Sequence, residues 1–185
     1  LRWLNGRYLR EKLSPEEVLQ RLRDWKLNDE FLGQVVPLAI QRLETLADFA
    51  PMTSFLSADE VEVDAESLTG KLEGEDAVRL IKVAEWEFEK LREWNGETIG
   101  SVFNRMAEVE ELKLKQFMPT FFVAISGSTV SLPLYDSMAI LGPDLCRSRL
   151  RRALETLAEA GHGLSKKGFK ALEKEYQAKY GNRPD

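Results

Sequence analysis

Apolar positions recur with a helical period along most of the chain, and they are densest over residues 117–141. Pro119, Gly127 and Pro133 punctuate this stretch. Glycine at 127 suits a helix C-cap because it reaches the left-handed conformation without a steric penalty. Proline at 133 suits the first turn of a following helix. The pattern predicts two short apolar helices around a polar loop, for which packing alone is a sufficient explanation.

Helical stripes of apolar residues also occur outside this hairpin. The clearest lie over 32–43, 77–91 and 99–106, where apolar side chains fall three or four positions apart. Val61 and Val63 alternate with acids, but two residues do not make a strand. We therefore predict an all-α chain of about nine or ten short helices.

Polar residues with capping ability stand before several of the stripes. Ser14 and Glu17 have the spacing of a capping box. Asp29, Thr98 and Ser165 are predicted to cap three later helices. These residues set the expected helix starts.

Residues 57–66 are the best linker candidate, because they are acidic and carry no broad apolar stripe. We predict two consecutive helical subdomains, 1–66 and 67–185. The first residue is Leu1 rather than methionine, and it lies inside a helical pattern. We interpret the chain as a piece of a longer polypeptide.

The composition, 43% hydrophobic and 31% charged, suits a globular domain, and no apolar run is long enough to cross a bilayer. The net charge of −5 argues against a protein that binds nucleic acid through its overall field. Basic residues nevertheless gather in places, which permits a local phosphate-facing surface; the alternative is a set of solvated helix faces. The gathered residues are Arg2, Arg7, Arg10, Lys12, Arg147, Arg149, Arg151, Arg152, Lys166, Lys167 and Lys170.

The chain lacks a glycine-rich phosphate loop, a Cys/His metal spacing and a Ser-His-Asp set. Cys146 is the single cysteine, and we predict a core position and a reducing compartment for it. His162 stands between two glycines and is predicted to be a solvated turn residue. We expect no catalytic residue, no metal site and no catalysis from this chain alone.

Two phrases resemble the C-terminal half of bacterial glutamyl-tRNA synthetases. The first is L-R-W-L-N-G-R-Y-L-R at 1–10, which resembles the segment after the family's catalytic half. The second consists of Ser126-Gly127, Ser131, Pro133-Leu134-Tyr135, Leu141-Gly142 and Arg149-Leu150. The phrases stand in the family's order, and the resemblance covers nearly the whole chain. It implies that 1–66 form the end of the stem-contact region and a first anticodon-binding subdomain. Residues 67–185 would form a second such subdomain with a helical tail.

The resemblance implies anticodon recognition by part of a glutamate–tRNA ligase. The full-length enzyme would attach glutamate to tRNA, and its ATP and Mg²⁺ would bind in the catalytic half, which this chain lacks. The implied protein is cytoplasmic and monomeric, binds no membrane, and takes glutamate tRNA; glutamine tRNA as a further substrate stays open. The alternative is a helical protein–protein interaction module without an RNA role, which the acidic charge and the long helices would suit.

Arg42 is the foremost site residue that the resemblance implies. In the family, an arginine in an R-x-x-T-L-x-x-F setting hydrogen-bonds the third anticodon base, and residues 42–49 match that setting. A guanidinium offers a planar fork of donors to a base edge and can also stack on a base. The alternative is a surface arginine with a packed stem.

Two further residues align with family positions that touch the anticodon, and a third stands beside them. Ser131 and Leu134 correspond to contacts with the first two bases, and Tyr135 offers a ring for stacking. Core or cap roles are equally consistent with these residues. Two family arginines are replaced, one by Phe122 and one by Asn104, and we predict that Arg105 substitutes for the second.

The opening phrase would adjoin the tRNA backbone. Asn5, Arg7 and Arg10 are predicted to donate to the backbone, and Arg147 on a later helix is predicted to face phosphates. Such contacts position the RNA and do not read its sequence.

Overall fold

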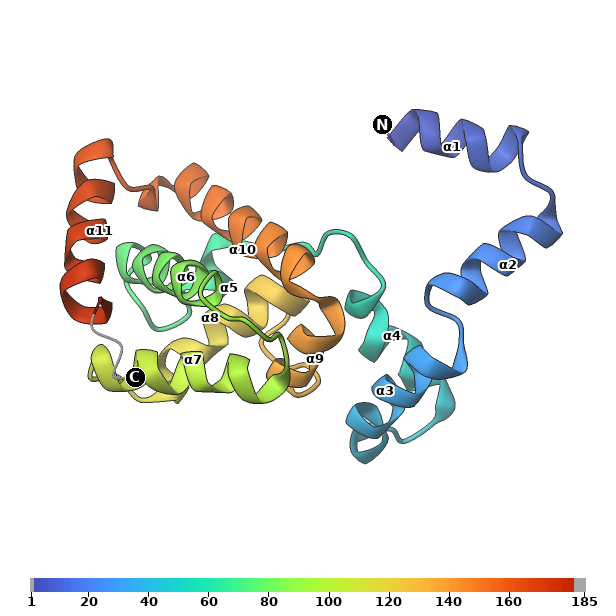
Figure 1. The fold of residues 1–185 in the computed structure, drawn as a ribbon, viewed down its shortest axis with the longest axis horizontal. Helices are drawn as coiled ribbons and strands as arrows, with labels where there is room; N and C mark the ends of the chain where they lie inside the picture. The colour runs from blue at the N-terminus through green and yellow to red at the C-terminus, as the bar shows by residue number, and fades with distance from the viewer. Residues whose placement is uncertain (1, 182–185) are drawn as a thin grey trace. The chain divides into compact units, whose positions relative to one another are not determined.

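The computed structural model describes residues 2–181, and every regular element in that range is helical (Figure 1). The all-α prediction is confirmed, although the described range has eleven α-helices instead of the nine or ten expected. One addition is the single turn α5 (Ala65–Thr69), which a capping carboxylate of Asp64 stabilises at the end of the acidic stretch. The chain divides into two compact units, Leu1–Thr53 and Ser54–Asp185. The predicted subdomain boundary after Glu66 refers to the family's subdomains and stays a prediction.

The first unit consists of short helices joined by tight turns. Its elements are α1 (Arg2–Glu11), α2 (Pro15–Trp25), α3 (Asp29–Ala39), the 3₁₀ turns η1 (Ile40–Arg42) and η2 (Leu46–Asp48), and α4 (Phe49–Thr53). Val35 and Ala39 are buried, whereas α2 buries none of its residues. Trp3 and Trp25 expose 69% and 54% of their surface, so α1 and α2 present large apolar side chains to solvent.

Local capping explains where two of these helices begin. The capping box at Ser14 is confirmed: the amide of Glu17 donates to Ser14 Oγ over 3.2 Å, and the amide of Ser14 donates to Glu17 Oε2 over 2.7 Å. The prediction of Asp29 as a cap is wrong. Asn28 keeps an extended backbone and accepts a hydrogen bond from the amide of Phe31, so Asp29 already lies in the first turn of α3.

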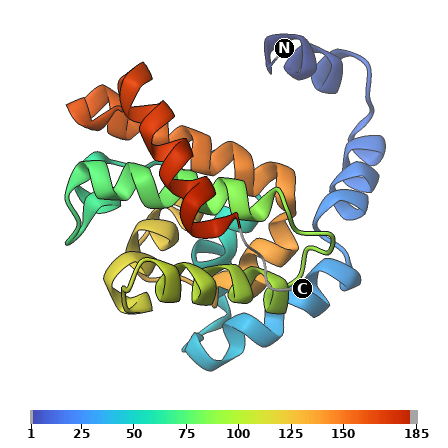
Figure 2. The same ribbon diagram turned by 60° about the vertical axis from the view of Figure 1, so that its left-hand side comes forward.

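The second unit holds the larger core. Its elements are η3 (Ser54–Leu56), α5, α6 (Gly74–Phe88), α7 (Gly96–Val109), α8 (Leu114–Ser126), α9 (Leu134–Leu141), α10 (Pro143–Leu157), a π-helical turn (Ala158–His162) and α11 (Lys166–Tyr180). Figure 2 shows α11, in red, lying against α6. The predicted apolar hairpin is α8 and α9, and Phe117, Phe121, Ile125 and Met138 within it are fully buried.

Two further caps can be compared with the sequence. Ser165 caps α11 as predicted, since its Oγ accepts from the amide of Gly168 over 3.1 Å. Thr98 does not cap α7; Asn95 does, and the two residues exchange hydrogen bonds between side chain and backbone. Thr98 is therefore the third residue of the helix and the reciprocal partner of the capping box.

Gly127 ends α8 with a φ of +75°, as the sequence predicts. A side chain there would be strained by this angle and would also meet the carbonyl oxygen of Glu62 at 3.0 Å. The glycine thus both reverses the chain and lets the acidic stretch pass close to the hairpin. Pro133 stands one residue earlier than predicted, at the N-cap of α9.

Arg149 joins three parts of the second unit. Its side chain is only 3% exposed. The prediction that Arg149 belongs to a set of basic residues facing phosphates or solvent is therefore wrong. The guanidinium donates to the carbonyl oxygens of Phe55, at 2.6 Å, and of Ala58 and Ile125. Position 149 faces the core because it follows Cys146 by one helical turn, and Cys146 is buried as predicted. Arg149 therefore fixes the start of the unit against the end of α8.

We expect Arg149→Met to lower the free energy of unfolding by about 2–4 kcal/mol, because three carbonyl groups lose a charged donor in a buried place. Urea denaturation followed by circular dichroism measures this change. Arg147→Met on the exposed side of the same helix is the control and should change stability by less than about 0.5 kcal/mol. Equal effects of the two variants would contradict the structural role of Arg149.

Candidate nucleic-acid interface

Arg42 is the last residue of η1, and its side chain is exposed. The turn that follows is held by Asp48, whose Oδ2 accepts from the amides of Thr45 at 2.7 Å and Glu44 at 3.1 Å. The hydrogen bond from the backbone of Thr45 is the main reason why the pKa of Asp48 is lowered. The segment after Arg42 therefore has a defined shape, set by local hydrogen bonds.

An open apolar groove of about 650 Å³ adjoins this turn within the first unit. Its most exposed members are Leu46 at 89%, Ile40 at 56% and Val36 at 38%. The full lining is Leu32, Val36, Ile40, Leu43, Glu44, Thr45, Leu46 and Phe49. A nucleic-acid base has an apolar face and a polar edge, so the groove could contact the face of a base while the nearby exposed Arg42 could reach for its edge.

Sequence reasoning missed Leu46 as a site residue. A signal is present in the sequence, because Leu46 is the leucine of the R-x-x-T-L-x-x-F setting, but the setting alone assigns a base contact only to its arginine. Exposure of this size was not predictable from a helical pattern, since it arises from the turn between η1 and η2. Leu46 extends the candidate site from one arginine to an arginine with an apolar neighbour.

The loop between α8 and α9 forms a second candidate surface. Ser131 is half-buried, whereas Leu134 is only 4% exposed and belongs to the core. Val130, which the sequence analysis did not single out, exposes 79% of its surface in this loop. A base at this place would therefore meet Val130 and Ser131 first, and Leu134 only if the loop moved.

Tyr135 already has an aromatic partner. Its ring stacks on Phe103 with centroids 5.5 Å apart and planes 15° apart, and burial raises the pKa of its hydroxyl. The ring also contacts Gly100, where a Cβ would lie 3.1 Å from Tyr135 Cδ2. One face of the ring is thus occupied within the protein, and only the remaining part is available to a base.

Arg105 points to α11 and not to the hairpin loop. Its Nη2 donates to the carbonyl oxygen of Tyr180 over 3.0 Å, and its Nε lies 3.7 Å from a carboxylate oxygen of Glu87. The guanidinium also lies over the ring of Tyr180. These contacts give Arg105 a structural task, and its predicted part in anticodon binding would require them to break.

The predicted backbone contacts lie on exposed helix faces. On α1, Asn5, Arg7 and Arg10 are exposed, and Arg7 pairs with Glu11 over 2.8 Å. On α10, Arg147 is exposed and donates to Asp144 over 3.1 Å. Both ion pairs join residues of one helix at the surface, where such pairs are weak enough to be exchanged for phosphate contacts.

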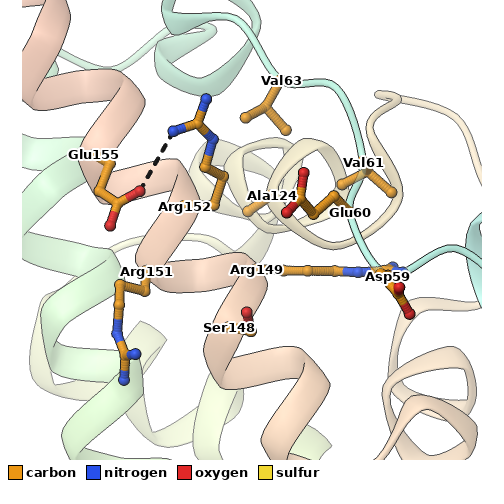
Figure 3. A pocket seen from close by; sticks show the side chains of 10 residues that line it. All are labelled: Asp59, Glu60, Val61, Val63, Ala124, Ser148, Arg149, Arg151, Arg152 and Glu155. Carbon is orange, nitrogen blue, oxygen red and sulfur yellow. Dashed lines mark hydrogen bonds and ion pairs between the residues drawn. The ribbon is translucent and has the colours of Figure 1, made fainter. Parts of the chain in front are cut away.

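A polar cavity of about 250 Å³ lies between α10 and the acidic stretch (Figure 3). Figure 3 shows Arg149 reaching across to the segment of Asp59, whereas Arg152 turns to Glu155, 3.4 Å away. Acids and arginines alternate around this cavity, so it has no single sign of charge. It does not combine a nucleophile with a base, and we assign it no catalytic role.

His162 lies against the start of α6, and the prediction of a solvated turn residue is wrong. A Cβ added to Gly74 would come within 2.1 Å of its Nδ1, so the half-buried imidazole fills the space that this glycine leaves. The positive φ of Gly161, +93°, turns the chain toward α6 and brings the ring there. The histidine is thus a packing residue.

Among residues 2–181, no group of His, Cys, Asp and Glu side chains could hold a metal ion. None of the helices in the same range has the length and apolarity to cross a membrane. Burial raises the pKa of the Cys146 thiol to about 12, which makes it a poor nucleophile at neutral pH.

A family model described as an anticodon binding domain matches residues 13–154 of this chain. The chain belongs to the anticodon-binding domain family. It is 44% identical over 96% of its length to a glutamate–tRNA ligase of Saccharophagus degradans, and 41% identical over 95% to one of Marinomonas sp.. It spans only 35% of the length of each of these relatives. The family assignment confirms the resemblance, and α11 lies beyond the matched range.

A crystal structure of a glutamate tRNA ligase from Elizabethkingia meningosepticum has a similar fold. The TM-score is 0.64 at 21% identity, and the match covers 84% of this chain and 32% of that one. This likeness supports the helical architecture.

We expect Arg105→Gln to lower the free energy of unfolding by about 1–2 kcal/mol, because the carbonyl group of Tyr180 loses a charged donor and the buried Glu87 loses one of its ion-pair partners. Urea denaturation measures the change, with Asn104→Ala at the exposed neighbouring position as the control. If Arg105 instead contacts the anticodon, its loss should leave stability unchanged and weaken RNA binding.

Proposed function

We propose that this chain recognises the anticodon of a glutamate-specific tRNA, as the anticodon-binding region of a glutamate–tRNA ligase. The observation that carries the proposal is the exposed Arg42, which directly precedes Leu43 in the lining of an open apolar groove and lies in a segment that matches the family's setting. The names of the relatives, glutamate–tRNA ligases at 40% identity and above, support the choice of amino acid.

The arrangement suggests how one base would be read. The Arg42 guanidinium would donate two hydrogen bonds to the edge of an unstacked base. Leu46 and Ile40, both largely exposed, would contact the apolar face of the same base. Edge and face contacts together select a base more sharply than either alone, because a wrong base would cover the donors of the arginine without accepting their hydrogen bonds.

The hairpin loop would supply a second group of contacts from the other unit. Ser131 would bond a base edge through its hydroxyl, and Val130 would offer an apolar surface. Leu134, which is buried, and Tyr135, which is half-buried, would support the loop from its protein side. Asn5, Arg7, Arg10 and Arg147 would bind the RNA backbone, which orients the tRNA without reading its sequence.

In the longer protein, this recognition would serve the attachment of glutamate to tRNA. ATP and Mg²⁺ would bind in a part of that protein outside this chain. We also infer a monomer that acts in the cytoplasm, where tRNA is charged. Whether glutamine tRNA is charged as well depends on how strictly Arg42 reads its base.

One observation favours the second candidate, a helical protein–protein interaction module. Trp3, Leu4 and Trp25 on α1 and α2 each expose more than half of their surface. An apolar surface of this kind usually marks a contact with another protein or another part of the same protein. Within a ligase, these faces would be covered by the rest of the polypeptide.

We expect Arg42→Gln to weaken binding of glutamate tRNA by about 1–3 kcal/mol, a factor of roughly 5 to 150, because a bidentate base contact is lost. In the full-length protein, it should also change the ratio of charging on glutamate and glutamine tRNAs. Filter binding and aminoacylation at one salt concentration measure these two effects.

Arg23→Gln is the matched control for this experiment. Arg23 is an exposed arginine of the same unit, on α2, so the control removes the same charge. Arg23→Gln should weaken the binding of glutamate tRNA and of glutamine tRNA slightly and to the same extent. If Arg42→Gln behaves like Arg23→Gln while circular dichroism is unchanged, Arg42 is an ordinary surface residue and the proposal fails.

A further inference from the structure

Helix α11 is attached to the second unit by polar contacts in addition to apolar packing. The hydroxyl of Tyr176 donates to Glu87 over 2.8 Å, and the hydroxyl of Tyr180 donates to Glu110 over 2.9 Å. The ring of Tyr176 also packs on Trp86, with centroids 4.6 Å apart. Since Glu87 and Glu110 come from α6 and the end of α7, α11 is fixed to two helices at once.

The acceptors of these bonds are buried, which makes the attachment specific. The side chains of Glu87 and Glu110 are 1% and 3% exposed. Arg79 and Lys90 pair with them, and the tyrosine hydroxyls complete their hydrogen bonds. A buried carboxylate that loses a partner is costly. Rotation of α11 about its own axis is therefore opposed, and one face of the helix is held toward solvent.

That outward face is a row of lysines. Lys166, Lys170 and Lys174 recur every fourth residue, and Lys167 stands beside them. All four are exposed, and together with Ala171 they line a shallow hollow of about 540 Å³. We refer to Lys166, Lys167, Lys170 and Lys174 as the lysine face.

The lysine face is not neutralised by its surroundings. Within the described residues, none of its four ammonium groups forms an ion pair or a hydrogen bond, whereas Lys179 on the same helix pairs with Glu175 and Glu110. Glu173 lies at the edge of the face and is exposed. Like charges four residues apart repel one another on a helix. Repulsion within the lysine face therefore lowers the stability of the free protein. The chain as a whole carries a net charge of −5, yet its acids do not neutralise these lysines.

We propose that the lysine face of α11 binds the phosphate backbone of the tRNA. The inference rests on the proposed function, and it adds a contact outside the range 13–154 that the family model matches. Ammonium groups on a rigid helix fit a row of phosphates, because each ion contact releases a condensed counterion and needs no base identity. The small side chain of Ala171 leaves the hollow open to the phosphate backbone of the tRNA.

The test compares two triple variants of this chain, each losing three positive charges. The first is Lys166→Gln, Lys170→Gln and Lys174→Gln. The second, the matched control, is Lys71→Gln, Arg92→Gln and Lys115→Gln, which changes three exposed residues elsewhere in the second unit. The dissociation constant for glutamate tRNA is measured between about 50 and 200 mM salt, and circular dichroism checks that both variants are folded.

We expect the slope of log Kd against log salt to fall by about 2–3 for the lysine-face variant, since each phosphate contact contributes just under one unit. The control should change the slope by less than one. Equal changes in both variants would show that only the overall field matters and would overturn the proposal. An unchanged slope in the lysine-face variant would overturn it as well.

Arg42→Gln, measured in parallel, separates this proposal from the proposed function. If Arg42→Gln weakens binding and the lysine-face variant does not, anticodon recognition stands and the lysine face is merely solvated. If the unchanged chain shows no binding of tRNA at low salt, the proposed function itself fails. If the lysine-face variant alone weakens binding, the phosphate contact stands without base recognition by Arg42.

Discussion

A single buried arginine sets the architecture of the second unit. Arg149 donates to the carbonyl groups of Phe55, Ala58 and Ile125, which belong to η3, to the following acidic stretch and to the end of α8. Backbone carbonyl groups are the hydrogen-bond acceptors of this guanidinium within residues 2–181, and burial lowers its pKa, although the charge of Asp59 acts in the opposite direction. Because Ile125 directly precedes the loop that carries Ser131, the same contact orients the candidate RNA-binding loop. Arg149 thus ties the stability of the second unit to the position of this loop.

Much of the fold follows from local rules, and these parts could be predicted. The capping box of Ser14, the left-handed Gly127 and the cap of α11 at Ser165 depend on residues within a few positions of one another. Asn28 and Asn95 were missed because another plausible cap stands one residue after the first and three residues after the second, and only the backbone decides between the candidates. Burial of Cys146 is the expectation for a single cysteine without a histidine or aspartate partner in the sequence, and it is confirmed.

Site residues that depend on distant contacts could not be predicted in this way. The sequence groups Arg149 with its exposed neighbours, yet its acceptors lie more than twenty residues away along the chain. Arg105 bonds to Tyr180, and His162 fills the space at Gly74; neither pairing leaves a local signal. The sequence setting predicts a role for Arg42, whereas the exposure of Leu46 is visible only in the geometry of the turn. The candidate recognition surface is built on such a turn, and the hydrophobic pattern of a sequence does not determine the conformation of a turn.

The central claim is that this chain binds the anticodon of a tRNA. Chemical footprinting of glutamate tRNA with and without the chain tests it most directly, because protection is read nucleotide by nucleotide. We expect protection of the anticodon bases, together with weaker, salt-sensitive protection of backbone positions. Protection that is confined to the acceptor end, or that leaves the anticodon bases as reactive as in free tRNA, would contradict the claim.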